Sequence, residues 1–334
     1  MTTSITNTTK KKNKKLLSIQ SHVVHGYVGN KAATFPLQYR GWDVDCLNTV
    51  QFSNHPGYGS FSGFKYPSNE LTDILQNGLL NFLKLNYSAI LTGYYPSPEG
   101  FLKISEILEE QYNNNKDNCD MKWILDPVLG DNGKLYVTEG MVEIYKKILT
   151  KCHIFCCTPN QFEMELLTAG QISTLDDLYK SFVKFHELYP NVKYIVVTNC
   201  NIQLLHKNSH DDNIIVACYN TITNKMHYCE TPLIPARFSG SGDLFTALLT
   251  DQLLQNNDGV MVNSLHDAVL KSIFLVDQIL RNTLDLYIKD NIGSTNNAQP
   301  VIKDLKLIQS RHILDIIDPT SPFEAIEYDP MIYF

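Results

Sequence analysis

The chain has 334 residues, of which 43% are hydrophobic and 19% are charged, and its formal net charge is −7. This length can bury a large core and lies near the upper end for a single α/β domain. The acidic balance gives no reason to expect a nucleic acid or an anionic membrane as a partner, so a small molecule is expected instead.

No stretch of the sequence is long and apolar enough to cross a bilayer, and the N-terminus lacks the apolar core of a signal peptide. The eight cysteines form no C-x-x-C pair, and several lie in apolar runs such as HIFCCT. This pattern indicates reduced, buried thiols and neither a disulfide framework nor a zinc site. A cytoplasmic protein is expected.

Residues 1–15 (MTTSITNTTKKKNKK) are polar and then basic, with no apolar periodicity. They are predicted to be a disordered tail that precedes a single domain over residues 16–334. The lysine run is expected to be solvated, and nuclear import remains an alternative use for it.

From Leu16 onwards, short apolar runs alternate with amphipathic segments. The runs predicted to be strands are LLSIQS, WDVDCLNTV, YSAILTG, MKWILD, HIFCCT and YIVVTN. The predicted helices between them cover Asn30–Tyr39, Asn69–Leu83, Glu99–Tyr112, Glu139–Leu149 and Leu175–Leu188, and Ser173 with Asp176 resembles a capping box for the last. Such alternation predicts a mainly parallel sheet with helices on both faces, and ligands in such folds bind at the carboxyl ends of the strands.

The alternation changes after Asn199. NIIVACYN and KMHYCET have no helix between them, which predicts antiparallel strands at one edge of the sheet. Long helices are expected over Asp243–Leu254 and His266–Ile288, followed by a final packing element over 301–334. There is no internal repeat and no sign of a second domain.

The segment FSGSGDLFTALL places a flexible turn, Gly240, Ser241 and Gly242, directly before an apolar-periodic helix. A helix N-terminus offers free backbone N–H groups to phosphate, and glycines let the backbone approach the anion. Asp243 in the first turn could then accept a proton from an attacking alcohol. The alternative is a glycine turn whose aspartate complements the helix dipole. The sequence has no G-x-x-x-x-G-K-[ST] loop and no protein-kinase motifs.

Acidic and amide side chains follow two predicted strands. Asp126 and Asp131 bracket DPVLGD, and Asn160 and Glu163 belong to TPNQFE. These groups could hold Mg²⁺ beside phosphate, directly or through water. The alternative is structural, because Asn160 with Glu163 is also a good helix N-cap and Asp126 before proline starts turns.

The segment SIQSHVVHGYVGNKAATF joins the first predicted strand to the first predicted helix and places Ser21 just past the strand end. His22 and His25 lie in the same loop. A lone histidine in a loop more often makes hydrogen bonds, so neither is assigned a catalytic role.

Seven segments in register resemble the pyridoxal kinases of the ribokinase-like superfamily. They are LSIQSHVVHGYVGNKAATFPLQ, NTVQFSNHPGY, LTGY, DPVLGD, TPNQFE-x-ELL, VVTN and SGSGDLFTA. The resemblance runs from Leu16 to about Ile288, with a weaker echo at QSRHILDI. It implies a three-layer α/β/α sandwich with a mostly parallel central sheet and antiparallel edge strands. It also implies ATP-dependent phosphorylation of the 5′-hydroxymethyl group of pyridoxal, pyridoxine and pyridoxamine, and a homodimer.

The resemblance implies a role for each matching residue. Ser21 would hydrogen-bond the pyridine ring, and Val28, Val50, Phe52 and Tyr94 would line the ring pocket. Asp243 would be the catalytic base, and Gly240, Ser241 and Gly242 the anion hole. The positions around the ATP phosphates, Mg²⁺ and a monovalent cation, expected to be K⁺, are Asp126, Asp131, Tyr136, Thr158, Asn160, Glu163 and Thr198, with Asp126, Asp131, Thr158 and Glu163 nearest the metals. Thr231, Pro232, Leu233 and Ile234 would lie over the nucleotide.

One departure concerns the predicted substrate loop. This chain has Pro56 where many family members carry threonine, which removes a hydroxyl and a backbone N–H beside the expected substrate. Two other functions remain open. A hydroxymethylpyrimidine kinase would share the fold, although such enzymes usually carry cysteine in place of Asp243. A catalytically silent protein that binds ATP or pyridoxal phosphate as a regulator is the other alternative.

Overall fold

The computed structural model describes residues 14–114, 121–138, 140–202, 213–257, 260–261, 263–291 and 299–330. Of the predicted disordered tail, residues 1–13 lie outside this part of the chain. Strand β1 begins at Lys15, the last residue of the predicted tail. Lys15 forms ion pairs with Asp43 (2.9 Å) and Asp45 (3.1 Å) of the neighbouring strand, so the charge that suggested a solvated tail is used to secure the first strand.

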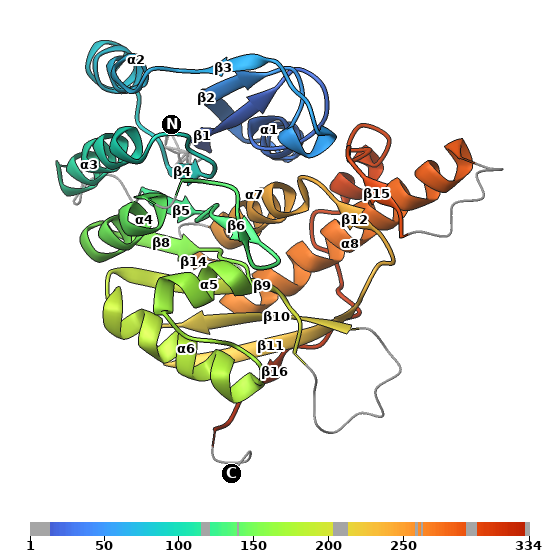
Figure 1. Cartoon of the computed structure of the whole chain (residues 1–334). Helices are drawn as coiled ribbons and strands as arrows, with labels where there is room; N and C mark the ends of the chain where they lie inside the picture. The colour runs from blue at the N-terminus through green and yellow to red at the C-terminus, as the bar shows by residue number, and fades with distance from the viewer. Residues whose placement is uncertain are drawn as a thin grey trace, which may run out of the picture.

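A ten-stranded sheet runs through the molecule in the order β16-β11-β10-β9-β8-β5-β4-β1-β2-β3 (Figure 1). The strands from β2 to β9 in this order pair in parallel, whereas β3, β10, β11 and β16 each pair antiparallel to a neighbour. The predicted fold class, a mostly parallel sheet with antiparallel edges, is therefore confirmed. Their bounds are β1 Lys15–Val23, β2 Asp43–Phe52, β3 Gly63–Lys65, β4 Ala89–Thr92, β5 Lys122–Leu125, β8 Ile154–Cys157, β9 Val192–Cys200, β10 Asn213–Asn220, β11 Lys225–Pro232 and β16 Ile326–Glu327.

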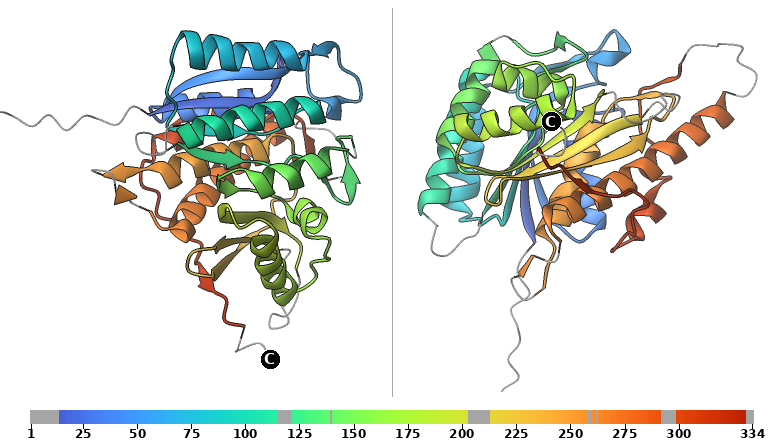
Figure 2. Two further views of the ribbon diagram at one scale, coloured as in Figure 1. Left: turned by 90° about the vertical axis from the view of Figure 1, so that its left-hand side faces the viewer. Right: turned by 90° about the horizontal axis from the view of Figure 1, so that it is seen from below.

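Helices cover both faces of this sheet (Figures 1 and 2). One hydrophobic core lies between the sheet and helices α2 to α6, and a second core lies between the opposite face and α1, α7 and α8. The helices are α1 Asn30–Tyr39, α2 Ser68–Asp73 with the π-helical stretch Ile74–Phe82, α3 Pro98–Asn114, α4 Gly140–Lys151, α5 Gln161–Thr168, α6 Leu175–Leu188, α7 Ser241–Leu254 and α8 Leu265–Asp290. The edge strand β3 is not among the elements predicted from the sequence, and the short helix α5 is anticipated only by the N-cap interpretation of Asn160 and Glu163.

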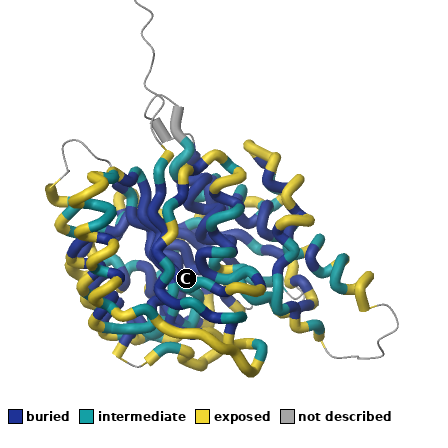
Figure 3. The backbone as a smooth tube through the Cα atoms, turned by 90° about the horizontal axis from the view of Figure 1, so that it is seen from above, coloured by how far each residue is buried: buried dark blue, intermediate teal, exposed yellow. Residues whose placement is uncertain are grey.

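The two cores explain why the strands are continuous apolar runs. Successive side chains of a strand point to opposite faces, so a strand covered on both sides needs apolar residues at every position. Leu16 lies in the second core and Leu17 in the first, and both are completely buried. Figure 3 shows the buried strands at the centre and the exposed positions concentrated on the outer helices and loops.

Other local predictions can be checked in the same way. Every described cysteine is free, and all of them except Cys46 are buried, in agreement with reduced thiols. The capping box of α6 was predicted one residue too early, because the helix begins at Leu175 and the residue before it, Thr174, pairs with Asp177. No helix within the described ranges has both the length and the apolar character that a membrane span requires.

Three further short pairings lie outside the large sheet in the described part of the chain. Strand β6 (Gly130–Asp131) forms a hairpin with β7 (Lys134–Leu135), and β12 (Arg237–Phe238) pairs in parallel with β15 (Val301–Ile302). The strands β13 (Asn256–Asn257) and β14 (Val260–Met261) form another hairpin. The described residues also form two 3₁₀ helices, Pro56–Tyr58 and Arg311–Asp315.

Candidate active site at the carboxyl edge of the sheet

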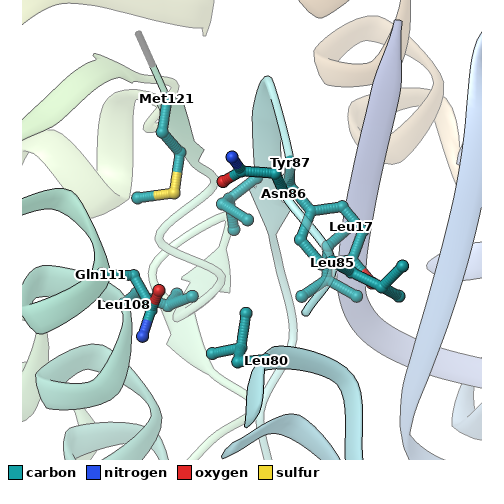
Figure 4. A pocket seen from close by; sticks show the side chains of 9 residues that line it. Leu17, Leu80, Leu85, Asn86, Tyr87, Leu108, Gln111 and Met121 are labelled. Atoms are coloured by element: carbon teal, nitrogen blue, oxygen red, sulfur yellow. The ribbon is translucent and has the colours of Figure 1, made fainter. Parts of the chain in front are cut away.

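The predicted site residues gather where the parallel strands end. Strand β1 has β2 on one side and β4 on the other, so the order of the strands reverses there, and a crevice forms at such a reversal on the carboxyl side. Tyr94, Asp126 and Thr158 come just after β4, β5 and β8 respectively. A small cavity lined by Leu17, Tyr87 and Met121 lies at the opposite, amino ends of the strands (Figure 4). Its free volume of about 10 Å³ admits one water molecule and no substrate.

The glycine turn before α7 is held against the loop that follows β1. Gly240 is the N-cap of α7 and has a φ of 84°. A Cβ at this position would lie 2.1 Å from the carbonyl oxygen of Tyr27, so no other residue fits without moving the backbone. Neither α7 nor α1 has a side-chain hydrogen bond at its N-cap. The N–H groups at the start of α7 therefore stay available to an anion. At the start of α1, the N–H groups of Lys31 and Ala32 already donate to the carbonyl oxygens of Val28 and Gly29.

Asp243, in the first turn of α7, faces the N-terminus of α1. The backbone N–H of Gly29 donates a hydrogen bond to its carboxylate. Burial raises the pKa of Asp243 to about 6, against the smaller lowering effect of this hydrogen bond. A carboxylate with this pKa is ionised at neutral pH and is a stronger base than an exposed aspartate. Gly29 also contacts Ser21, because a Cβ on Gly29 would lie 2.3 Å from the Ser21 hydroxyl oxygen.

Two buried carboxylates, Asp126 and Glu163, lie behind Asp243. Burial, together with the negative charges of Glu163 and Asp243, raises the pKa of Asp126 well above its ordinary value. Burial also raises the pKa of Glu163 to about 7, although backbone N–H groups of Leu129, Asn160 and Gly130 oppose this. Burial therefore disfavours both charges, and a cation beside them would stabilise both.

The structural interpretation of Asn160 and Glu163 is confirmed, because they form the capping box of α5. The Asn160 side chain accepts from the Glu163 N–H at 2.9 Å, and the Asn160 N–H donates to Glu163 Oε2 at 2.9 Å. The other carboxylate oxygen accepts from the N–H of Leu129 at 2.8 Å and thereby fixes the DPVLGD turn. The same glutamate thus caps a helix and contributes charge to the site.

A pair of threonine hydroxyls joins the carboxylate pair to α7. Thr158 Oγ1 lies 3.2 Å from Thr246 Oγ1, which is 3.5 Å from Asp126 Oδ2. Thr246 was not singled out in the sequence. The signal that could have found it is its spacing of three residues from Asp243, which puts both on one face of α7.

Asp131 is not brought into the buried carboxylate pair. It is exposed at the tip of the β6–β7 hairpin, and its two oxygens accept from the backbone N–H (2.8 Å) and the side chain (2.7 Å) of Asn132. Within the described part of the chain, no three His, Cys, Asp or Glu side chains are close enough together to hold a metal ion. The predicted metal residues Asp126, Asp131, Thr158 and Glu163 therefore do not form a preassembled cage, and Mg²⁺ would have to take most of its ligands from phosphate and water.

The remaining residues predicted to contact the nucleotide surround this region. Tyr136 is 57% exposed, and partial desolvation and the charges of Glu163, Asp126 and Asp243 raise the pKa of its hydroxyl. Thr198, in β9, forms a bridge with Asn160. The segment predicted to lie over the nucleotide continues from the carboxyl end of β11, with Thr231 and Ile234 buried and Pro232 and Leu233 exposed.

The residues predicted to line the ring pocket form one apolar cluster. Val23, Val50 and Phe52 are its buried members, and the half-buried Val28 and Tyr94 pack against them. Val50 is completely buried, so it supports the wall of the cluster from behind and only the half-buried members present a surface. Val23 also belongs to this cluster, although no sequence pattern singles it out. The ring of Phe61 packs on Phe52 with centroids 4.6 Å apart.

Pro56 lies at the first position of a 3₁₀ turn that follows β2. His55 is the N-cap of this turn, and its Nδ1 accepts from the N–H of Gly57 at 3.2 Å. The first residue of a helical turn has no internal partner for its N–H, and the φ of proline suits this position. The lost N–H therefore costs no hydrogen bond within the loop, and only the lost threonine hydroxyl remains as a possible change in substrate contact.

We therefore expect Pro56→Thr to change KM for pyridoxal, the substrate that the family resemblance implies, several-fold and kcat little. One neutral hydrogen bond contributes about 0.5–1.5 kcal/mol, and the extra loop freedom opposes this gain. Steady-state kinetics with pyridoxal, pyridoxine and pyridoxamine would measure the change, with Pro67→Thr at the start of α2 as a control for the general effect of removing a proline. A large fall in kcat at unchanged KM would place residue 56 in the chemical step.

Comparisons with known proteins agree with this geometry. A family model described as "Phosphomethylpyrimidine kinase" matches residues 98–296. The Saccharomyces cerevisiae protein named "Putative pyridoxal kinase BUD17" is 48% identical over 93% of this chain and 95% of its own length. Pyridoxal kinase of Arabidopsis thaliana is 34% identical over 94% of both chains. The solved structure of pyridoxal kinase from Leishmania donovani in complex with ADP and pyridoxamine is 28% identical, has a TM-score of 0.77, and covers 95% of this chain and 100% of its own.

The matches to these two relatives and to this solved structure each cover 93–95% of the chain. This chain belongs to the pyridoxal kinase family of the ribokinase-like superfamily.

Proposed function

We propose that the protein transfers the γ-phosphoryl group of ATP to the 5′-hydroxymethyl group of pyridoxal, and of pyridoxine and pyridoxamine. The observation that carries this proposal is the position of Asp243. Its carboxylate accepts from the N–H of Gly29, which contacts Ser21 and follows Val28 of the apolar cluster. On the other side, its charge acts on Asp126 of the carboxylate pair. This position suits a base at the junction of an alcohol site and a phosphate site.

The proposed chemistry assigns one step to each group. The apolar cluster, Val28 and Tyr94 in particular, holds the pyridine ring, and Ser21 hydrogen-bonds its polar edge. Asp243 accepts the proton of the 5′-hydroxyl as its oxygen attacks the γ-phosphorus, and the bond from that phosphorus to the ADP oxygen breaks. The N–H groups of Gly240, Ser241 and Gly242 stabilise the charge on the transferring group.

Mg²⁺, when bound with ATP, neutralises phosphate charge and orients the leaving group. Asp126 and Glu163 would face it, directly or through water, and Thr158 and Thr246 supply hydroxyl oxygens nearby. Such a cation would stabilise both carboxylates and lower their raised pKa values. A monovalent cation, K⁺ in our proposal, would lie among hydroxyl and carbonyl oxygens close to Thr158 and Thr198.

Turnover with purified protein tests the proposal. We expect ADP formation that depends on pyridoxal, and a product with the mass of pyridoxal 5′-phosphate. Hydroxymethylpyrimidine is the competing substrate, and a higher kcat/KM for it would reassign the enzyme. Binding of ATP and pyridoxal without any turnover would instead support a regulatory protein.

We expect turnover to require both kinds of cation. An assay with excess Mg²⁺ in tetramethylammonium buffer should be slow, and addition of K⁺ should restore the rate. The matched addition is choline chloride at the same ionic strength, which should not restore it. Equal rates in K⁺ and choline would exclude the monovalent site, and retention of the rate in excess chelator would exclude Mg²⁺.

Two further features belong to the same proposal and are supported only by the family resemblance or the composition. One is a homodimer, which sedimentation of the purified protein would test. The other is a cytoplasmic location with nuclear access, which imaging of the tagged full chain would test.

A further inference from the structure

The chain segment 300–304 runs from the glycine turn to the apolar cluster. Its first part is bound to the residues that lead into the turn: the N–H of Arg237 donates to the carbonyl of Pro300 at 2.8 Å, and the N–H of Ser239 donates to the carbonyl of Ile302 at 3.1 Å. These bonds form the β12–β15 pair, which ends two residues before Gly240. The segment is therefore fixed to the phosphate side of the site.

Its last part is bound to the loop that contains Pro56. The carbonyl oxygen of Lys303 lies 3.0 Å from Nε2 of the buried His55. The Lys303 ammonium lies 4.5 Å from the centroid of the Tyr58 ring, and the Tyr58 hydroxyl donates a hydrogen bond to Asp304 Oδ2. The rings of His55 and Tyr58 meet edge to face at 5.0 Å.

Asp304 also contacts the loop after β1. Its Oδ2 lies 3.3 Å from Nε2 of His25. Its Oδ1 is buried and has no hydrogen-bond partner among the described residues, and it points at Gly26, where a Cβ would lie 2.2 Å away. Position 26 requires glycine for two reasons: its φ is 92°, and there is no space for a side chain. The loop therefore closes around the carboxylate.

The loop after β1 (residues 24–29) and the loop after β2 (residues 53–62) both border the apolar cluster. The first continues from Gly26 to Val28, which packs against the buried members of the cluster, and then to Gly29, which donates to Asp243. The second continues directly from Phe52. One carboxylate thus joins the two loops to each other and, through its own chain segment, to the strand that precedes the glycine turn.

We infer that Asp304 is a positioning residue for the phosphoryl acceptor. It holds the two loops that border the acceptor pocket, residues 24–29 and 53–62, through its contacts with His25 and Tyr58. It sets the distance between the acceptor pocket and the phosphate end of the site. The inference rests on the proposed function for the identity of the acceptor. We call Asp304 with His25, Gly26 and Tyr58 the clamp. The contacts of the clamp do not depend on the identity of the acceptor.

The kinetic test uses Asp304→Asn, Tyr58→Phe and the double variant. Hydrogen bonds to a charged group are strong enough that loss of one should raise KM for pyridoxal about tenfold, while KM for ATP stays unchanged. KM for pyridoxal in the double variant should be no higher than in the more strongly affected single variant, because both changes break the same contact. Additive effects of the two substitutions, or equal increases of both KM values, would overturn the inference.

The matched controls are Asp315→Asn and Tyr39→Phe. Tyr39 donates to Asp315 at 2.9 Å, so this pair is also a tyrosine–aspartate bond between the C-terminal region and an earlier element, here the end of α1. Neither residue contacts the clamp or the proposed catalytic groups, and we expect unchanged KM values. If these variants raise KM for pyridoxal as strongly as Asp304→Asn does, the effect is a general loosening and the positioning role is wrong.

Hydrogen exchange of the ligand-free protein tests the clamp without any turnover. Backbone amides of residues 24–29 and 53–62 should exchange faster in Asp304→Asn, and those of α3 should not. Faster exchange in a protein that fails to phosphorylate pyridoxal would keep the clamp and reject the proposed substrate. Unchanged exchange in both loops would reject the clamp, whatever the activity.

Discussion

Replacing Asp243 by asparagine is expected to lower kcat by about 10²–10⁴-fold, the usual contribution of a general base. Asparagine keeps the size of the side chain and can still accept the Gly29 hydrogen bond, so the geometry of the turn should persist. ATP affinity should change little, because the N–H groups of Gly240 to Gly242 remain. The measurement is single-turnover kinetics with a titration of ATP binding. A variant with near-normal kcat would remove Asp243 from the role of base.

The pH dependence offers a second measurement of the same role. The pKa of Asp243 is about 6, and the base must be ionised to accept a proton. The wild-type kcat/KM should therefore fall about tenfold per pH unit below pH 6 and level off above it. The limb near pH 6 should vanish in the asparagine variant, and a profile identical to wild type would contradict the assignment.

As the pH rises, ionisation of Asp243 should increase activity but decrease the stability of the folded protein. The pKa of Asp243 is higher in the folded protein than its ordinary value of 3.8, so ionisation favours the unfolded state. The protonated form contributes fully below about pH 3.8, and its contribution is lost as the pH rises through about 6. At pH 8 the asparagine variant should therefore melt at or above the wild-type temperature, and this advantage should shrink towards pH 4. A marked loss of stability at pH 8 would mean that the carboxylate is structural.

The second large effect concerns a buried ion pair away from the clamp. Arg40 and Asp251 form an ion pair in which the side chains are 4% and 1% exposed. The Arg40 guanidinium also donates to the carbonyl oxygens of Leu314 (3.0 Å) and Ile316 (2.9 Å). Asp251 accepts in addition from Trp42 Nε1 at 2.9 Å. The pair thus joins the end of α1, helix α7 and the C-terminal segment.

Arg40→Ala should lower the free energy of unfolding by about 3–5 kcal/mol, because it leaves the Asp251 carboxylate buried without its cation. Chemical denaturation of wild type and variant would measure this. Arg40→Lys should recover only part, since an ammonium cannot reproduce the planar fork that reaches the carboxylate and both carbonyls.

Lys14→Ala is the matched control for this pair. Lys14 lies 3.9 Å from the same carboxylate but is 43% exposed, so its removal should cost about 0–1 kcal/mol. Similar costs for the two alanine variants would contradict the buried-pair argument. Where Arg40→Ala is folded, its kcat should match wild type, because no atom of the pair reaches the proposed reaction centre.

The sequence by itself determined the order and type of most elements. Strands covered on both faces are continuous apolar runs, and the helices between them carry one apolar stripe each, so local pattern was sufficient. It also determined the glycine turn before α7 and the capping box of Asn160 and Glu163, because both depend on residues at most four apart in the chain. The resemblance added roles, and the structure brings Val28, Val50, Phe52 and Tyr94 together as that resemblance implied.

The tertiary structure decided the features that depend on contacts between distant residues. Lys15 belongs to β1 only because Asp43 and Asp45 of the next strand pair with it, and Asp131 is kept out of the carboxylate pair by its own hairpin. The raised pKa of Asp243 depends on burial beside Gly29, which is 214 positions earlier. Tyr58 and Asp304 are 246 residues apart, and no local pattern marks either one. Contacts between residues so far apart in the chain form only when the whole sheet and its helices have packed together. For this reason they could not be predicted from the sequence.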